Sequence, residues 1–341
     1  MDGSEDLSIL EEMVMEKIKN IPFVKKVGFN RIALVLVLIL MYFLFSLGAK
    51  RMLGASAIMN ALNMTDYLGF LALGVTFVIA TGGIDFSIGP VMFCSGLIAG
   101  RLMVVNNWPV LLCLFVCVII GAIFGTCAGF LVAYMELPSF ISSMALMNVA
   151  KGVGSVYTHV QSSTWPQSTE PRGWYKNLIS FHGFPTGLVF LLIVAVICAI
   201  ILNNTRAGRY ILCIGSNREA VRLSGVNTKK WEMLAYVICG TLAGMAAITY
   251  AGVNTSFQPG LGDEFNNNAI ASCVMGGTSM SGGVASISGS IIGVLIISLL
   301  RVGIQSWRLG TKLSPDYQYI ITGIIVALAV YTDVRSSKRR K

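Results

Sequence analysis

Two glycine-containing motifs hold the polar residues that are best placed to do chemistry. GGIDFSIG at 82–89 contains Asp85, and GGTSMSGG at 276–283 repeats four of its positions at a constant offset of 194. A glycine pair favours a break in a membrane helix, and the freed backbone groups survive only where they line a cavity or are buried in protein. Matching broken segments in two halves are typical of transport sites, although two Gly-rich packing segments can also be similar by chance. The glycines expected to break the helices are Gly82, Gly83, Gly89, Gly276, Gly277 and Gly283.

The polar residues of these segments each have two interpretations. A carboxylate at membrane depth, such as Asp85, is costly and marks a functional site. Near a surface the same group caps the helix that starts near Ser87. The amides that precede the second motif can hydrogen-bond the hydroxyl groups of a sugar, or they can satisfy the backbone of a broken helix. The candidate substrate-pathway residues are Asp85, Ser87, Asn266, Asn267, Asn268, Thr278 and Ser279.

The composition places these motifs in a membrane. Of 341 residues, 55% are hydrophobic and 12% are charged, whereas soluble domains carry about 25% charged residues. A membrane-spanning helix needs roughly 20 apolar residues. We therefore predict an all-α integral membrane protein with about ten transmembrane helices and Gly-broken segments in two internal repeats. Clear spans lie at 32–49, 110–135, 186–203, 233–252 and 316–332, and interrupted ones at 55–80, 88–105, 138–153, 264–280 and 284–305.

The net charge of +9 predicts the topology, because cytoplasmic loops collect Lys and Arg. Residues 204–232 and the tail RSSKRRK are basic, whereas 154–185 are rich in aromatics and poor in basic residues, which suits the outer side. Within the N-terminal tail, residues 7–20 fit either an interfacial amphipathic helix or a solvated segment. The predicted parts are a cytoplasmic tail 1–30, a transmembrane domain 31–333 with outer loop 154–185 and cytoplasmic loop 204–232, and a basic cytoplasmic tail 334–341.

Several chemistries have no motif in this chain. It lacks a phosphate-binding GxxxxGK[ST] loop, so we do not expect it to hydrolyse ATP itself. The eight cysteines form no CxxC pair and fall mostly in apolar runs, so we expect them to be buried. Both histidines, His159 and His182, lie in one polar loop. We expect no catalytic residue, no metal site and no directly bound cofactor. An ion-driven transporter and a membrane-bound sensor are the rival classes.

Four segments, taken together, resemble the ribose-type sugar permeases of bacterial ATP-binding cassette (ABC) importers, a superfamily shared with branched-chain amino-acid permeases. TGGIDFSIG (81–89) is similar to that family's TGGIDLSVG signature, and PSFISSMALM (138–147) to the segment after its fourth long helix. RAGRYILCIGSNREAVRLSGVN (206–227) is similar to its cytoplasmic loop, and AIASCVMGGTSMSGG (269–283) to its AIAAxxxGGTSxxGG stretch. The chain departs from the family at Asn266–Asn268, where an acidic residue often stands, and at Ser272, where the family has Ala. These departures weaken inference about the substrate.

The resemblance implies a role and a set of partners. The chain would be a pore subunit in the bacterial inner membrane, with both termini cytoplasmic, moving a monosaccharide like ribose, galactose or xylose by alternating access. A nucleoside or a branched-chain amino acid is the alternative substrate. The implied partners are a second permease subunit, identical or different, an ABC ATPase subunit that holds ATP and Mg, and a periplasmic or lipid-anchored binding protein; no nucleic acid is implied. The implied ATPase-coupling residues, in a short coupling helix, are Arg209, Asn217, Arg218, Glu219, Arg222 and Gly225.

Overall fold

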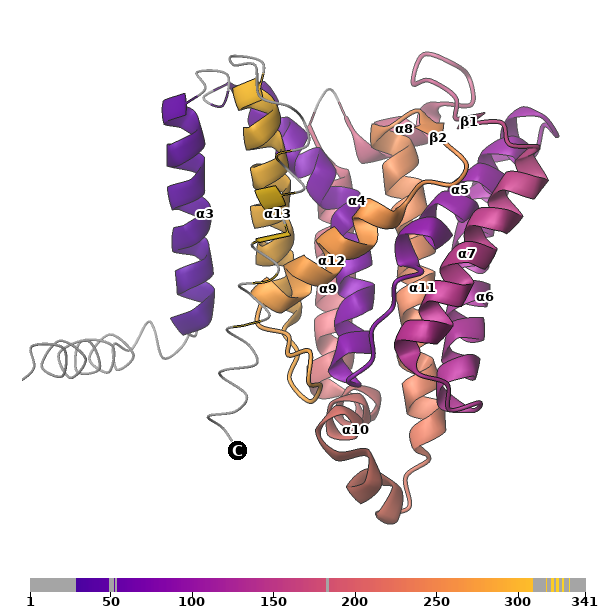
Figure 1. Ribbon diagram of the computed structural model, residues 1–341. Coiled ribbons are helices and arrows are strands. Elements are labelled where there is room, and N and C mark those ends of the chain that lie inside the picture. The colour runs from indigo at the N-terminus through magenta and orange to yellow at the C-terminus, as the bar shows by residue number, and fades with distance from the viewer. Residues whose placement is uncertain are drawn as a thin grey trace, which may run out of the picture.

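The computed structural model describes residues 29–48, 52, 54–181, 184–308 and scattered positions between 317 and 331. Both predicted terminal tails, His182 and most of the predicted crossing at 316–332 lie outside the described residues. In the described part, nearly all regular structure is helical (Figure 1). The elements are α3 (Phe29–Gly48), α4 (Ala55–Ala80), α5 (Ile88–Val104), α6 (Val110–Ala133), α7 (Ser139–Thr158), β1 (Ser163–Thr164), α8 (Trp174–Ile179), α9 (Gly187–Asn204), α10 (Arg206–Leu223), α11 (Thr228–Val253), β2 (Ser256–Phe257), α12 (Asp263–Met275) and α13 (Ile287–Arg308).

The long helices run roughly side by side, and the polar connections gather at two opposite ends (Figure 1). The short helix α8 and the antiparallel pair β1–β2 lie at one end, and α10 lies at the other. The β1–β2 pair joins the connection after α7 to the connection after α11, and the fully buried Trp165 donates its backbone N–H to the carbonyl O of Thr255. The segments predicted as outer and cytoplasmic loops are therefore on opposite sides of the bundle.

Helix α4 is the centre of the bundle, since every residue from Met64 to Ala80 is buried. It packs against α9, α11, α12 and α13. A helix that is apolar on all faces is stable only when it is enclosed by other helices or by lipid, and α4 is enclosed by protein.

Helices α3, α6 and α9 differ from the buried α4, because each of them exposes large apolar side chains. Five described helices are long and apolar enough to cross a membrane, namely α4, α6, α9, α11 and α13. An apolar surface of this extent is unfavourable in water and favourable against lipid. Exposed examples are Leu36, Leu40 and Phe43 of α3, Leu111, Phe115 and Ile119 of α6, and Val189, Ile193 and Val196 of α9.

Glycines bring α6 and α11 into close contact. A Cβ added to Gly121 would collide with the carbonyl O of Gly240, and one added to Gly244 would collide with the carbonyl O of Cys117. Small residues at such positions let membrane helices approach to backbone contact.

Three predicted boundaries were wrong. Helix α7 continues through 154–158, so the outer loop starts later than predicted, and the loop itself contains β1 and α8. Residues 206–223 are helical over more of the predicted cytoplasmic loop than the short coupling helix that the resemblance implied, and α11 begins at Thr228 instead of 233. Helix α12 ends at Met275, because Gly276 and Gly277 turn the chain there. Two cysteines, Cys127 and Cys213, are exposed rather than buried.

Candidate functional site

Residues 81–87, here called break 1, connect α4 to α5. Gly82 has φ +85°, and its N–H and that of Gly83 donate to carbonyls of the last turn of α4. A Cβ on Gly83 would lie 2.5 Å from the hydroxyl of Tyr236. The N–H of Ile84 donates to Ser139 Oγ at the start of α7, at 3.2 Å. The broken backbone is therefore satisfied by neighbouring protein, as a break at membrane depth requires.

Asp85 lies in break 1 and is 1% exposed. Its Oδ1 accepts hydrogen bonds from the backbone N–H of Ser87 at 2.8 Å and from the Ser87 hydroxyl at 2.6 Å. Ser87 is the residue before the first turn of α5. These bonds form a local turn before α5, but Asp85 is buried rather than near a surface, and the side chain of Ser87 does not cap α5 itself.

The amide of Asn266, on α12, holds the other side of break 1. Its Oδ1 accepts from the N–H of Gly89 at 2.7 Å, and its Nδ2 donates to the carbonyl O of Phe86 at 2.5 Å. Asn266 is 1% exposed, and its bond to Gly89 is buried, whereas its bond to Phe86 is only partly buried. Of the three consecutive amides, Asn268 is also buried and Asn267 is exposed. Asn266 therefore satisfies backbone groups beside the broken helix, while the side chain of Asn267 is exposed.

Residues 276–286, here called break 2, connect α12 to α13. The buried Thr278 accepts from the N–H of Ser286 at 3.2 Å, and the N–H of the buried Ser279 donates to the carbonyl O of Val284 at 2.9 Å. Positive φ falls on the first glycine of the pair in break 1 (Gly82) and on the second in break 2 (Gly277). The two motifs thus share the property of breaking a helix without sharing one backbone conformation.

The two breaks meet each other beside α10. The N–H of Gly283 in break 2 donates to the carbonyl O of Ala80, the last residue of α4, at 3.0 Å. In Figure 1 the end of α4, the connection between α12 and α13, and α10 occupy the same end of the bundle. The sequence motifs that are 194 residues apart are therefore neighbours in space.

Helix α10 is two helical pieces that meet at Asn217, whose φ of −159° and ψ of 95° are not helical. Asn217 Oδ1 accepts from the N–H of Ala220 at 3.0 Å and so caps the second piece. That piece ends before Gly225, which has φ +80°. The asparagine and the glycine therefore define a short separate helix, as the coupling-helix expectation requires.

The charged side chains of α10 are exposed but paired. Arg218 Nη2 lies 2.8 Å from Glu232 Oε2 of α11. Arg222 donates to both carboxylate oxygens of Glu219, at 2.6 and 2.9 Å, and this lowers the pKa of Glu219. The Arg209 side chain is exposed and donates weakly to the carbonyl O of Asn204, at 3.4 Å. The arrangement presents a polar surface, with charge of both signs, at one end of the bundle.

A second polar surface was missed by the sequence reasoning. Lys151 of α7 pairs with Asp263 of α12, with Nζ and Oδ2 2.6 Å apart. Asn148 of α7 and Asn267 of α12 are exposed on the same two helices. These four residues are here called the α7–α12 strip. The signal available in the sequence was a lone lysine inside a predicted crossing, which is expensive in lipid.

Helix α12 is held from both sides at its first turn. Asp263 binds α7, while the next residue, Glu264, pairs with Arg301 of α13 at 3.0 Å. Two acidic residues at this position also match the positive end of the helix dipole. The strip is thus a fixed part of the bundle.

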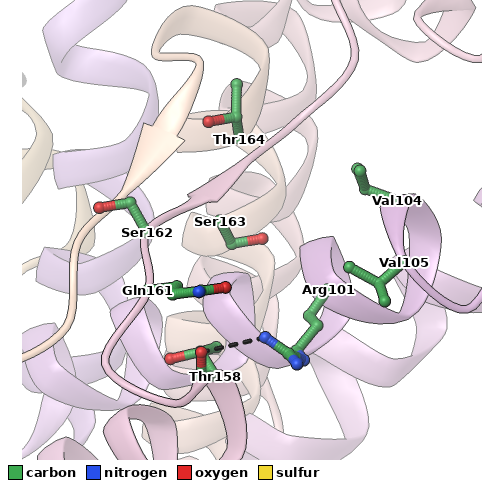
Figure 2. A pocket seen from close by; sticks show the side chains of 8 residues that line it. All are labelled: Arg101, Val104, Val105, Thr158, Gln161, Ser162, Ser163 and Thr164. Carbon is green, nitrogen blue, oxygen red and sulfur yellow. Dashed lines mark hydrogen bonds between the residues drawn. The ribbon is translucent and has the colours of Figure 1, made fainter.

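A small pocket of about 70 Å³ opens near β1, at the end of the bundle opposite α10 (Figure 2). The guanidinium of Arg101 points into it. It donates to the carbonyl O of Thr158, the last residue of α7, at 3.0 Å. A cation at this point compensates the negative end of the α7 dipole. A larger hollow of about 190 Å³ near α8 is lined mostly by apolar residues such as Phe70, Leu114 and Phe190.

The chain is similar to known permeases over most of its length. The family described as the permease component of branched-chain amino acid transport systems matches residues 57–330. The ribose import permease protein RbsC of Escherichia coli (strain K12) is 34% identical over 276 residues, 80% of this chain and 84% of the relative. RbsC of Bacillus subtilis (strain 168) is 33% identical over 286 residues, 82% of this chain and 85% of the relative. The xylose transport system permease protein XylH of E. coli (strain K12) is 28% identical over 347 residues, 84% and 87% of the two chains.

A solved structure supports the fold. A metal-chelate-type ABC transporter in an inward-facing conformation matches with a TM-score of 0.50 and 14% sequence identity, over 89% of this chain and 98% of the other. The predicted all-α membrane fold is confirmed by this match and by the helical bundle. Together with the sequence matches, these findings show that the chain belongs to the ribose-type sugar permease family of ABC importers, whose members are multi-pass inner-membrane proteins.

Proposed function

We propose that this chain imports a monosaccharide as the membrane-spanning subunit of an ABC importer. A separate ATPase subunit, which holds ATP and Mg, powers the transport, and an extracytoplasmic binding protein delivers the sugar. The observation that carries the proposal is the similarity of at least four-fifths of the chain to permeases named for ribose and xylose. The chain itself supplies the pathway and the docking surfaces rather than the hydrolytic chemistry.

The α7–α12 strip is the surface best suited to line the pathway. Amide and charged groups at membrane depth cannot face lipid without a large cost, so they face water or another protein chain. We assign the strip to a pore formed with a second permease subunit. Exposed amides and a neutralised ion pair can bind hydroxyl groups without demanding a charged solute. Of the pathway residues predicted from the sequence, Asn267 keeps this role, whereas Asp85 and Asn266 hold break 1.

The end of the bundle that carries α10 is assigned to the cytoplasm, where it would dock on the ATPase. Its exposed residues Arg209, Glu219 and Arg222 can make charge-assisted hydrogen bonds across such an interface. The opposite end, with β1, β2 and α8, would then receive the binding protein. With α3 crossing outward first, this orientation places both termini in the cytoplasm.

Co-purification with uptake tests the proposal. The tagged chain, extracted from its native host in mild detergent, should bring down an ATP-binding cassette subunit and a binding protein that are identified by mass. Tritiated ribose, a nucleoside and leucine should then be tested for binding to that binding protein. Sugar binding supports the proposal, and selective leucine or nucleoside binding would move the chain to the alternative substrate class. Uptake driven by an ion gradient in vesicles stripped of the ATPase would contradict the importer mechanism.

A further inference from the structure

Three backbone segments meet at one point at the α10 end of the bundle. Gly215 lies in the first piece of α10, Ala80 ends α4, and Gly283 lies in break 2. A Cβ on Gly215 would collide with the carbonyl O of Ala80 and would lie 2.5 Å from the N of Gly283. The hydrogen bond from Gly283 N to Ala80 O, at 3.0 Å, passes directly against Gly215. No β-carbon fits at this point without displacing backbone.

The neighbouring glycines extend this contact to break 1. A Cβ on Gly282 would lie 2.8 Å from the carbonyl O of Gly215 and 2.9 Å from the N of Gly82. Gly282 and Gly82 have φ of +78° and +85°, a region that favours glycine. The first piece of α10, break 1 and break 2 therefore touch through main-chain atoms. We call this contact the glycine junction, made of Ala80, Gly82, Gly215, Gly282 and Gly283.

Main-chain contact of this kind transmits displacement with little loss. Side chains can change rotamer and absorb a movement, whereas packed backbone moves as a unit. Asn266 also fastens α12 to break 1, through Phe86, and to the first turn of α5, through Gly89. A shift of α10 therefore reaches the ends of α4 and α12 and the starts of α5 and α13 together.

We propose that Gly215 is a positioning residue for transport, through which a movement of α10 is passed to both helix breaks at once. The inference rests on the proposed function, in which the ATPase docks on α10. The ATPase contacts the exposed charged residues of the second piece of α10 and displaces them. The first piece moves with the second and displaces both breaks through the glycine junction. Because α12 carries part of the α7–α12 strip, a displacement of both breaks changes the shape of the pathway wall.

The test uses the complete complex of permease, ATPase and binding protein in proteoliposomes, with tritiated ribose as the probe. Gly215→Ala should reduce the ribose imported per ATP hydrolysed by at least about fivefold, the lower end of typical coupling between sites. The yield and thermal stability of the complex are measured in parallel, because a β-carbon at position 215 has to displace backbone; the ratio is compared in complexes that are still assembled. Cys213→Ala changes an exposed residue two positions earlier on the same helix and should keep the wild-type ratio. A wild-type ratio in Gly215→Ala would overturn the proposal.

Hydrogen–deuterium exchange on the wild-type complex gives a second test that does not depend on folding of the variant. On adding a non-hydrolysable ATP analogue, peptides covering 80–88 and 276–286 should change their exchange rates together. A change in one break without the other, in a complex that imports ribose, would overturn the proposal. If the wild-type complex imports no solute or hydrolyses no ATP, the proposed function is contradicted instead. Failure of the proposed function is therefore distinguishable from failure of the proposal for Gly215.

Discussion

Replacing Asn266 with alanine removes both hydrogen bonds that tie α12 to break 1. The change leaves the N–H of Gly89 and the carbonyl O of Phe86 without their partner, in a site where Asn266 itself is 1% exposed. Each buried backbone group without a partner costs about 1–3 kcal/mol. The Gly89 N–H is buried, whereas the Phe86 carbonyl is only partly buried, so the variant should lose about 1–3 kcal/mol of folding free energy, chiefly from Gly89.

Thermal unfolding in mild detergent measures this loss. The lower value corresponds to a fall of at least about 1 °C in the unfolding temperature, and the upper value to about 4 °C, at about 1.4 °C per kcal/mol for a chain of this size. Asn267→Ala is the matched control, because it removes the same side chain from the next position, where the amide is exposed.

Hydrogen–deuterium exchange localises the effect. The peptide that contains Gly89 should exchange faster in Asn266→Ala than in wild type, because its N–H has lost its acceptor. If Asn266→Ala melts at the same temperature as Asn267→Ala and the exchange of 82–93 is unchanged, Asn266 does not hold break 1 and the reasoning is wrong.

Three further predictions concern the exposed polar surfaces. Lys151→Met leaves the carboxylate of Asp263 unpaired in the α7–α12 strip. It should therefore reduce sugar uptake more than the double variant Lys151→Met/Asp263→Asn does. Equal loss of uptake in both variants would show that the ion pair itself is unimportant. Glu219→Lys and Arg209→Glu should uncouple ATP hydrolysis from uptake without impairing membrane insertion, and normal uptake in both would remove α10 from the coupling role. A hydrogen bond from Lys229 lowers the pKa of Glu136 from its ordinary value of 4.5, so the stabilisation exists above that pH and disappears as the pH falls through the lowered value. The difference in unfolding temperature between wild type and Lys229→Met should accordingly shrink on acidification below about pH 4.5, and a constant difference would contradict it.

The apolar segments predict most of the fold because length and hydropathy alone define a membrane helix. The spans predicted at 110–135 and 186–203 agree with α6 (Val110–Ala133) and α9 (Gly187–Asn204) within about two residues. The prediction failed where a helix ends inside the membrane. The crossing predicted to run to 280 stops at Met275, because the glycine pair that follows turns the backbone, as the motif itself indicated.

The site was harder to predict because its contacts join distant parts of the chain. Asn266 binds Gly89 across 177 positions, and one sequence offers no sign of that pairing. Both interpretations of Asp85 were reasonable, since the same carboxylate suits a pathway and a helix start. Its local bonds to Ser87 become visible only once the chain is folded. The α7–α12 strip was overlooked because its four members come from two segments and each is isolated in the sequence.

The non-helical residue at Asn217 has a consequence for how this protein and its partners can diverge. The first piece of α10 buries Ile211 and Ile214 against the bundle and touches both breaks, so its sequence is constrained by the interior of its own chain. The second piece, from Arg218 to Leu223, projects outward and leaves Leu223 74% exposed. Apart from the buried Val221 and Arg218, which pairs with Glu232 of α11, substitutions in this piece should leave the membrane domain undisturbed. The kink at Asn217 thus separates a segment packed against the bundle from a segment exposed for docking. Grafting residues 218–225 from a relative should transfer that relative's choice of ATPase, while the transported solute stays the same.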